Sequence, residues 1–248
     1  MALLEDLANK AKTKNSRILL PESTDPRVIE ASRFISDQNL AQIVLFDEDA
    51  ASSLGVDSIN LKNEDLRLEY AQTLFELRKH KGVSFEAALE MLSSPSVCAM
   101  IALHRSEVDG VVTGAITPSQ EVLSSALRII GISENSNLVS SMFLMVFDED
   151  HNRYGENLIF TDCAMNISPN SDELAEIAFS AYETAQSFLD EEPKLAMLSF
   201  STNQSAKHSE VDKVRQATEM VRSRLPNAQI IGNVQLDAAL DSEVLKIK

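Results

Sequence analysis

The sequence of 248 residues lacks several features that mark particular classes of protein. Its two cysteines, Cys98 and Cys163, lie far apart, so neither a disulfide framework nor a cysteine-based zinc site is expected. The four histidines show no metal-ligand spacing, so we expect them in loops or on the surface and predict no metal site. Basic residues number 22 against 38 acidic ones, and the net charge of -16 argues against a nucleic-acid partner. One local anion pocket remains compatible with that charge.

Long apolar runs are also missing. No segment approaches the roughly 20 consecutive apolar residues that a membrane helix needs. Residues 1–7 have no basic region followed by an apolar core, and the 7 glycines and 7 prolines form no linker. Hydrophobic residues nevertheless make up 44% of the chain, enough to fill the core of one large or two ordinary domains. We therefore expect a cytoplasmic globular protein without membrane association.

Strands and helices alternate in the first half of the chain. Residues 17–20 and 43–46 are predicted strands, with a third, short strand at residues 61–63. Asp25 is a predicted N-cap, with Pro26 at the first position of its helix. The predicted helices span residues 4–14, 26–36, 64–79, 84–92 and 120–130. Such alternation predicts an α/β fold in which helices cover a parallel sheet.

The pattern changes near residue 138. Residues 138–147 and 157–160 are two apolar segments joined by a polar connection, which predicts an antiparallel pair of strands. A helix that begins within residues 168–171 is expected to end at Phe188. We therefore predict two α/β domains, residues 1–137 and 138–248, with parallel or mixed sheets flanked by helices.

A run of hydroxyl side chains follows the predicted buried strand at residues 195–198. The hydroxyls belong to Ser199, Ser201, Thr202 and Ser205. A helix is predicted next, over residues 210–224, so the order is strand, polar loop, helix. Ligands of open α/β sheets bind beyond the carboxyl ends of the strands, where hydroxyls and helix N–H groups suit phosphate. The alternative, that these hydroxyls only cap the helix, fits the composition equally well.

Two further segments end predicted strands with small or polar residues. Residues 108–115 place a strand between Gly110 and Gly114, but this glycine spacing does not match a dinucleotide fingerprint, and alone it indicates only a turn. Asp162 and Asn166 stand at the end of another strand, where a binding residue can be held. Cys163 between them is interpreted as a small buried hydrophobe rather than a nucleophile.

Several segments of the sequence resemble a known protein family when they are taken together, although no single segment is specific. They are residues 17–22 with 25–27, 76–82, 108–115, 138–141, 162–166 with 174–178, 197–202 and 235–239. In this order, across essentially the whole chain, they resemble the phosphate acetyl/butyryltransferase family. The resemblance implies two domains related in fold to isocitrate and isopropylmalate dehydrogenases, with the active site in the cleft between them. It also implies exchange of an acetyl group between acetyl phosphate and coenzyme A, and a homodimer.

The reaction implied by the resemblance needs donors for the phosphoryl oxygens, a base for the thiol and a donor for the developing oxyanion. It needs no permanently bound cofactor, because coenzyme A is a substrate. The predicted substrate-binding residues are Ser199, Ser201, Thr202, Ser205, Thr113, Gly114, Asp162 and Asn166. The hydroxyl loop and the Thr113–Gly114 turn are expected to face each other across the cleft and to hold the phosphoryl group.

The sequence also departs from the family's pattern. The chain ends at Lys248, before the family segment Asn-Asp-Leu-Ser-Arg-Gly that supplies a catalytic Asp, a Ser and a coenzyme-binding Arg, so no catalytic residue is assigned. Ser124 and Ser125 stand where Arg-Pro is usual, which removes a bidentate anion donor. Residues 117–119 replace His-Thr-Thr, and residues 203, 206 and 208 replace glycines.

These departures leave alternatives to a phosphate acetyltransferase: a non-catalytic domain that binds acyl-coenzyme A or acyl phosphate, a butyryltransferase-like enzyme, or a remnant without ligand. Without the strands and helices of the absent family segment, sheet edges and an apolar face would stay uncovered. We therefore expect the chain to self-associate. The basic residues at positions 78, 79, 81, 105 and 128 are candidates for a coenzyme phosphate, although a solvated charged face is the favoured interpretation.

Overall fold

The computed structural model describes residues 2–134, 136–147, 157–188, 192–202 and 207–247. The chain divides into two compact units, Ala2–Gly131 and Ile132–Lys248. The sequence had suggested a boundary between residues 137 and 138.

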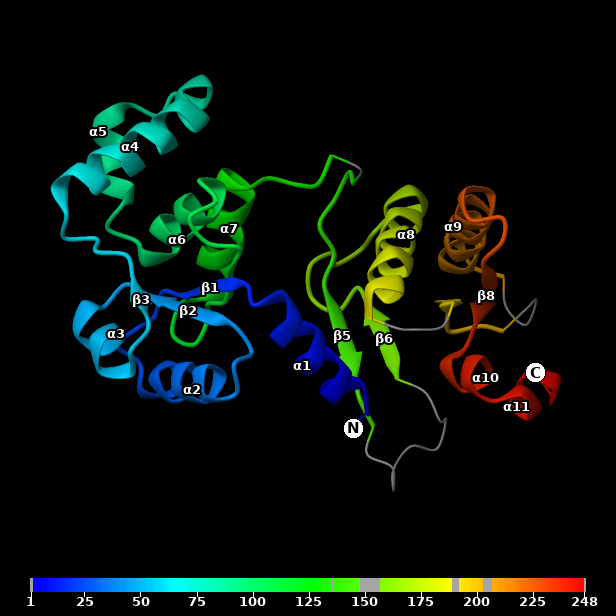
Figure 1. Cartoon of the computed structure of the whole chain (residues 1–248). Coiled ribbons are helices and arrows are strands. Elements are labelled where there is room, and N and C mark those ends of the chain that lie inside the picture. Colours follow the sequence, from blue (N-terminus) through cyan, green and yellow to red (C-terminus); the bar gives the residue numbers. More distant parts are fainter. Residues whose placement is uncertain (1, 135, 148–156, 189–191, 203–206, 248) are drawn as a thin grey trace. The chain divides into compact units, whose positions relative to one another are not determined.

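A four-stranded parallel sheet forms the centre of the first unit, in the order β3-β2-β1-β4 (Figure 1). The strands are β1 (Arg17–Leu20), β2 (Gln42–Leu45), β3 (Asp57–Ser58) and β4 (Gly110–Val111). The helices are α1 (Ala2–Lys14), α2 (Pro26–Asp37), α3 (Glu48–Leu54), α4 (Glu64–Arg78), α5 (Phe85–Met91), α6 (Pro95–His104) and α7 (Ser119–Ile129), with a 3₁₀ turn at Lys79–Lys81. The predicted parallel α/β arrangement is confirmed for this unit.

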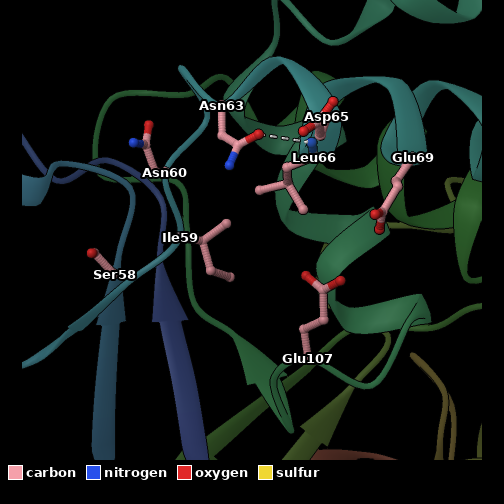
Figure 2. Close-up of a pocket in the computed structure, with 8 residues that line it drawn as sticks. All are labelled: Ser58, Ile59, Asn60, Asn63, Asp65, Leu66, Glu69 and Glu107. Atoms are coloured by element: carbon pink, nitrogen blue, oxygen red, sulfur yellow. Dashed lines mark hydrogen bonds between the residues drawn. The ribbon is translucent and has the colours of Figure 1, made fainter.

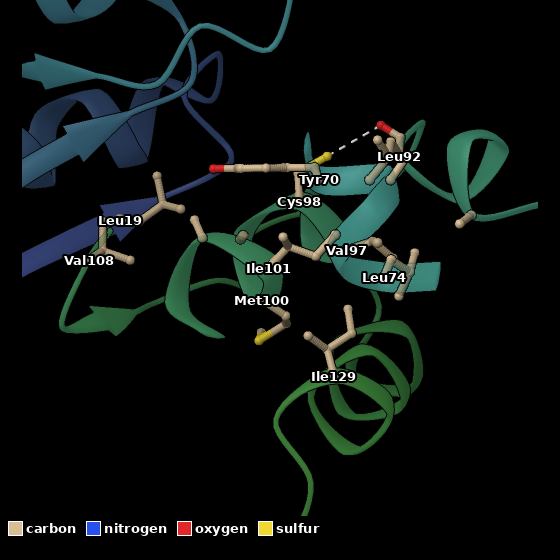
Figure 3. Packing of buried hydrophobic residues seen from close by; sticks show 14 of the residues in the cluster. Leu19, Tyr70, Leu74, Leu92, Val97, Cys98, Met100, Ile101, Val108 and Ile129 are labelled. Atoms are coloured by element: carbon tan, nitrogen blue, oxygen red, sulfur yellow. Dashed lines mark hydrogen bonds between the residues drawn. The ribbon is translucent and has the colours of Figure 1, made fainter. Parts of the chain in front are cut away.

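Both faces of this sheet are covered, because successive strand residues point to opposite sides. On one side Leu19 and Val44 pack with residues of α4, α6 and α7, and Figure 3 shows Leu19 and Ile101 within this cluster. On the other side Leu20 and Leu45 pack with residues of α2 and α3. The sheet is therefore the middle of three layers.

The prediction of a third strand at residues 61–63 is wrong. The third strand is Asp57–Ser58, and the segment after it turns into α4. Two asparagine side chains build that turn: Asn60 accepts the N–H of Lys62 at 2.7 Å, and Asn63 accepts the N–H of Leu66 at 3.1 Å. Asparagine favours such turns and caps over strands, and this preference outweighs the apolar Leu61.

Helices α3 and α6 had not been predicted. In α6 every residue from Ser96 to Ala102 is buried, so its apolar residues surround the helix and show no amphipathic period. Among the described residues no single helix is long and apolar enough to cross a membrane. Only α5 and α6 taken together have that length and composition, and they are bent by 111° relative to each other.

The second unit contains two small sheets. Strands β5 (Met142–Met145) and β6 (Leu158–Thr161) pair antiparallel, as predicted, although β5 is shorter than the predicted segment 138–147. Strands β7 (Lys194–Leu198) and β8 (Gln229–Val234) pair in parallel. The helices are α8 (Ser171–Phe188), α9 (Ser209–Arg224), α10 (Leu236–Leu240) and α11 (Ser242–Ile247). Strand β8, α10 and α11 had not been predicted.

Residues 195–198 form the predicted strand, as part of β7, but the prediction that this strand is buried is wrong. Only Met197 of β7 is buried, whereas Leu198 is 41% exposed. Met197 packs with Ala178 of α8 and Val214 of α9, so these helices cover one face of the strand. An apolar run of four residues does not distinguish a strand covered on one side from a strand covered on both.

Helix α9 approaches β8 closely at Gly232. A Cβ added to residue 232 would lie 2.2 Å from Oγ1 and 2.7 Å from Cβ of Thr218. The position accepts only glycine, because the backbone of the strand and the side chain of the helix share that space.

Candidate functional site

The loop between β4 and α7 contains two of the predicted site residues, Thr113 and Gly114. Gly114 has φ +110°, a conformation that side chains disfavour, and a Cβ there would meet nothing within 4 Å. The hydroxyl of Thr113 is buried and has no hydrogen-bond partner among the described residues. Buried polar groups are usually hydrogen-bonded, and this oxygen has almost no surface through which a ligand could reach it.

Glu22 holds this loop, a role that the sequence had not indicated. One of its carboxylate oxygens accepts the backbone N–H groups of Gly114 and Ala115 at 3.0 and 2.8 Å. The other accepts those of Ile116 and Thr117 at 3.0 and 2.7 Å. Glu22 directly follows the Pro21 that ends β1, so the neighbouring strands β1 and β4 bring the acid and the loop together. The sequence signals were an acidic residue directly after a strand and the family resemblance of residues 17–22 and 108–115, and neither signal shows that the two segments meet.

Glu22 is 6% exposed and ionised. Burial raises the pKa of its carboxyl, but hydrogen bonds from the Thr117 side chain and from three backbone N–H groups outweigh burial and lower the pKa to about 2. Hydrogen bonds to the charged form of a carboxylate favour that form. At neutral pH the loop therefore surrounds a full negative charge that belongs to the protein.

Arg27 supports the same loop from its carbonyl side. Its guanidinium donates to the carbonyl oxygen of Ala115 at 2.7 Å and to both carboxylate oxygens of Asp25 at 3.0 and 2.8 Å. Asp25 also accepts the N–H of Arg27 at 2.8 Å and is the N-cap of α2, as predicted. Asp25, the N-cap of α2, thus orients Arg27, and Arg27 in turn holds the loop that precedes α7.

The other strand-end site, in the second unit, is organised by Asp162. Its carboxylate accepts hydrogen bonds from the backbone and hydroxyl of Ser141, from the backbone N–H groups of Ala164, Met165 and Asn166, and from the Asn166 side-chain amide. The same amide donates to the carbonyl of Val139 at 3.0 Å. The structure therefore brings Asp162 and Asn166 together, and both are engaged in folding this turn.

Ser141 also belongs to this turn, and the sequence had not singled it out as a site residue. Its hydroxyl accepts the N–H groups of Cys163 and Ala164 at 3.0 and 2.7 Å while it donates to Asp162. Burial raises the pKa of the Asp162 carboxyl, but the hydrogen bonds from Ser141 and Asn166 outweigh burial and hold that pKa well below its usual range. The Cys163 thiol donates to the carbonyl of Phe160 at 3.2 Å and is half-buried, not fully buried as expected.

The hydroxyl loop after β7 is described as far as Thr202, and the predicted site residue Ser205 lies outside the described residues. Ser199 is half-buried; its hydroxyl accepts the N–H of Ser201 at 3.2 Å. Ser201 and Thr202 are 2% and 1% exposed, and Thr202 exchanges hydrogen bonds with Gln235. Of the three described hydroxyls in this loop, Ser199 presents the most surface to a ligand.

The basic residues considered for a coenzyme phosphate lie in charge pairs where the structure records their contacts. Arg105 pairs with Glu69 and Glu107 at 2.6 Å each, and Lys79 pairs with Glu76. The Nδ1 atom of His208 accepts the N–H of Glu210 at 3.1 Å, so this histidine caps α9. No group of three or more potential metal-ligating side chains occurs in the described part of the chain.

The first unit also contains a pocket of about 380 Å³ next to the start of α4 (Figure 2). It is lined by Ser58, Ile59, Asn60, Asn63, Asp65, Leu66, Glu69 and Glu107, none of which is a predicted site residue. Three carboxylates and no basic side chain line it, so it does not suit a phosphate group.

The model of a family described as phosphate acetyl/butaryl transferase matches residues 2–248. The chain belongs to this family. A phosphate acetyltransferase from Clostridium acetobutylicum is 40% identical over 100% of this chain and 78% of its own length. The family resemblance inferred from the sequence is confirmed, and the chain is a member of a family of phosphate acyltransferase enzymes.

Solved structures agree with this membership. The phosphotransacetylase from Streptococcus pyogenes superposes with a TM-score of 0.89 at 33% identity, over 100% of this chain and 76% of that one. A branched-chain phosphotransacylase from Enterococcus faecalis has a TM-score of 0.66 at 17% identity, over 94% of this chain and 73% of that one, and so supports the fold alone. Within the phosphate acetyl/butaryl transferase family, this chain is thus much more similar to the first of these two structures.

Proposed function

We propose that this protein exchanges an acetyl group between acetyl phosphate and coenzyme A. The observation that carries the proposal is the identity of 40%, along the whole chain, with a protein named phosphate acetyltransferase. The branched-chain enzyme, whose name indicates larger acyl groups, is only 17% identical. Acetyl is therefore the acyl group that this similarity favours.

In the proposed reaction the thiolate of coenzyme A attacks the carbonyl carbon of acetyl phosphate. The S–C bond forms, the C–O bond to the phosphoryl group breaks, and inorganic phosphate leaves. The thiol proton passes to a base that we do not assign to a residue of this chain. The half-buried hydroxyl of Ser199 is the proposed donor to a phosphoryl oxygen.

Asp162 and Asn166 have an indirect role in this proposal. Because their side chains fold the turn after β6, they fix the backbone around Cys163 rather than reach for a ligand themselves. Ser201 supports Ser199 through its backbone N–H, which donates to the Ser199 hydroxyl at 3.2 Å, and the buried Thr202 pairs with Gln235.

The direct test mixes the purified protein with acetyl phosphate and coenzyme A and follows the absorbance of the thioester bond. Thioester formation well above a sample without protein is expected, and butyryl phosphate in a parallel assay should react at least about tenfold more slowly. Equal rates with both acyl phosphates would contradict the acetyl preference. Ser199→Ala should raise KM for acetyl phosphate, whereas Ser53→Ala, an exposed serine on α3, is the matched control.

A second candidate is a protein that binds acyl-coenzyme A or acyl phosphate without turnover. Ser124 favours it, because a neutral hydroxyl stands where the family usually has an arginine, and this hydroxyl donates to the carbonyl of Glu121 at 3.0 Å. Calorimetric binding of coenzyme A and of phosphate, in a sample that forms no thioester, would support this candidate. Light scattering on the same sample tests the expected homodimer.

A further inference from the structure

Helix α9 begins with a histidine as its N-cap, whereas Ser, Thr, Asp and Asn are the usual residues at this position. His208 has an extended backbone, and its Nδ1 atom accepts the N–H of Glu210 at 3.1 Å. A ring nitrogen that accepts a hydrogen bond carries no proton, so this contact requires a neutral imidazole with its proton on Nε2. The family usually has glycine at residue 208, and glycine has no side chain to accept this bond. The cap therefore depends on a side chain that departs from the family's pattern.

A protonated His208 cannot keep this cap. Protonation makes both ring nitrogens donors, so Nδ1 would direct an N–H at the N–H of Glu210. The start of a helix also disfavours a positive charge, because the helix dipole places partial positive charge there. Histidine is the side chain whose charge ordinarily changes between about pH 5 and 8. The hydrogen bond at the start of α9 is thus exposed to a change of pH in this range.

Charged groups near His208 give the protonated ring another partner. The carboxylate of Glu210 pairs with Nζ of Lys213 at 2.5 Å. The hydrogen bond and the charge of Lys213 lower the pKa of the Glu210 carboxyl, and the attraction to His208 lowers it further. Glu210 is therefore an ionised acceptor close to the ring. From the loop after β7, the recorded contact is with Phe200, which does not titrate.

The contact with Phe200 depends on the same orientation of the ring as the cap. The two rings lie edge to face, with centroids 5.8 Å apart and an angle of 80° between their planes. The Phe200 side chain is 58% exposed, so other contacts cover less than half of it. An imidazole ring that turns from the N–H of Glu210 towards its carboxylate changes its position relative to Phe200 as well. Both contacts should accordingly be lost together.

We propose that His208 is a pH-operated switch at the start of α9. In the neutral form it caps the helix and holds the Phe200 ring; in the protonated form it releases both and pairs with the carboxylate of Glu210. The switch lies close to Ser199, the residue before Phe200, but it does not rest on the proposed function, because it needs no substrate.

A titration of the full chain by nuclear magnetic resonance, from pH 8 to pH 5, tests this switch. It records the ring nitrogen shifts of His208, the amide signal of Glu210 and the nuclear Overhauser effect between the rings of His208 and Phe200. His208→Asn keeps a side-chain acceptor at the cap but does not titrate. His104→Gln, which changes an exposed histidine at the end of α6, is the matched control.

At pH 8 we expect the ring nitrogen shifts of the tautomer with its proton on Nε2. On acidification the Glu210 amide signal should move with the same midpoint as the His208 ring, and the Overhauser effect to Phe200 should disappear. The rate of hydrogen exchange at Glu210, divided by the rate in His208→Asn, should rise from about one at pH 8 to about fivefold at pH 5, as for the loss of an N-cap. His104→Gln should behave as the original protein does.

Three results would overturn the proposal. A proton on Nδ1 at pH 8 would exclude the cap, and a Glu210 amide signal that does not follow the His208 ring would show that the cap is insensitive to protonation. A titration of this amide signal that persists in His208→Asn would trace the change to the carboxylates of α9 instead. If His208→Asn does not fold, His208→Gly replaces it, and the Glu210 amide signal should then stay constant across the same pH range.

Discussion

Glu22 and Asp162 are both acidic residues that follow a strand and gather backbone N–H groups, but they act over different distances along the chain. Glu22 binds a loop 92 to 95 residues away, on a neighbouring strand of the same sheet. Asp162 binds N–H groups two to four residues ahead, and its most distant partner, Ser141, is 21 residues away. The first contact therefore requires a folded sheet, whereas the second is mainly a local turn.

The largest effect is expected from Gly232→Ala, which tests whether the Asp162 turn stays folded when the packing of α9 on β8 is disturbed. Gly232→Ala should cost about 3 kcal/mol or more, because a Cβ there overlaps Thr218 and forces α9 away from β8. Hydrogen exchange should become fast in β8 while the N–H groups of Ala164 and Asn166 stay protected.

Gly110→Ala in the first unit is the matched control for that substitution. The nearest atom to its added Cβ is the flexible end of Ile18, at 2.9 Å, so a cost of about 1 kcal/mol is expected. Fast exchange at Ala164 and Asn166 in the Gly232→Ala protein would show that the turn is not local after all.

The next prediction concerns how the stability that Glu22 contributes depends on pH. Glu22→Gln should cost about 2–3 kcal/mol at neutral pH, because the neutral amide cannot accept four N–H groups. The pKa of Glu22 is about 2 in the folded protein against 4.5 for an unperturbed glutamate. Its contribution to stability is thus complete above pH 4.5 and is lost as the pH falls towards 2.

Urea unfolding of the original protein and of Glu22→Gln, at several pH values across this window, measures the difference in unfolding free energy. The difference should shrink steadily as the pH falls. A difference that stays constant over the window would mean that the charge of Glu22 is not what holds the loop.

Asp162→Asn is expected to lower the free energy of unfolding by less, about 1.5 kcal/mol. The Asp162 carboxylate is only half-buried, so the N–H groups that lose it can form hydrogen bonds with water. Exchange should accelerate at residues 164–166 without a change in β7 or β8. Asp172→Asn, an exposed acid in the first turn of α8, is the control and should stay within about 0.5 kcal/mol.

The smallest expected effect concerns the arginine that supports the Glu22 contact. Arg27→Ala should cost about 0.5 kcal/mol, since the Arg27 side chain is 69% exposed and its pair with Asp25 is screened by solvent. Thermal unfolding with Arg27→Lys as the matched variant measures this. A loss as large as that of Glu22→Gln would mean that the arginine and the acid contribute equally to the loop.

The sequence predicted the elements whose signals are local. The Asp25-Pro26 cap, β1 and the long helices α8 and α9 were located to within a few residues, because caps and amphipathic periods depend on near neighbours. Helix α6 was missed because it is buried on all sides, and β3 was misplaced because two asparagines turn the chain where an apolar residue suggested a strand.

The same distinction applies to the candidate site. Asp162 and Asn166 were singled out because both lie in one short polar segment after a strand, and the structure brings these two side chains together. The role of Glu22 was missed, since its partners lie 92 or more residues away and are backbone groups that no side-chain pattern announces. Family resemblance pointed to the segments 17–22 and 108–115 separately, but only the paired strands show that they meet.

The distance between Glu22 and its loop also bears on the order of folding. Loop closure over some 90 residues must precede that contact, and the entropic cost of such closure delays non-local contacts relative to local ones. A partly folded chain can therefore contain the turn at Asp162 while residues 113–117 remain unorganised. In this protein residues 114–117 can take their conformation only after β4 has joined β1, so the loop before α7 depends on a pairing between two distant parts of the chain.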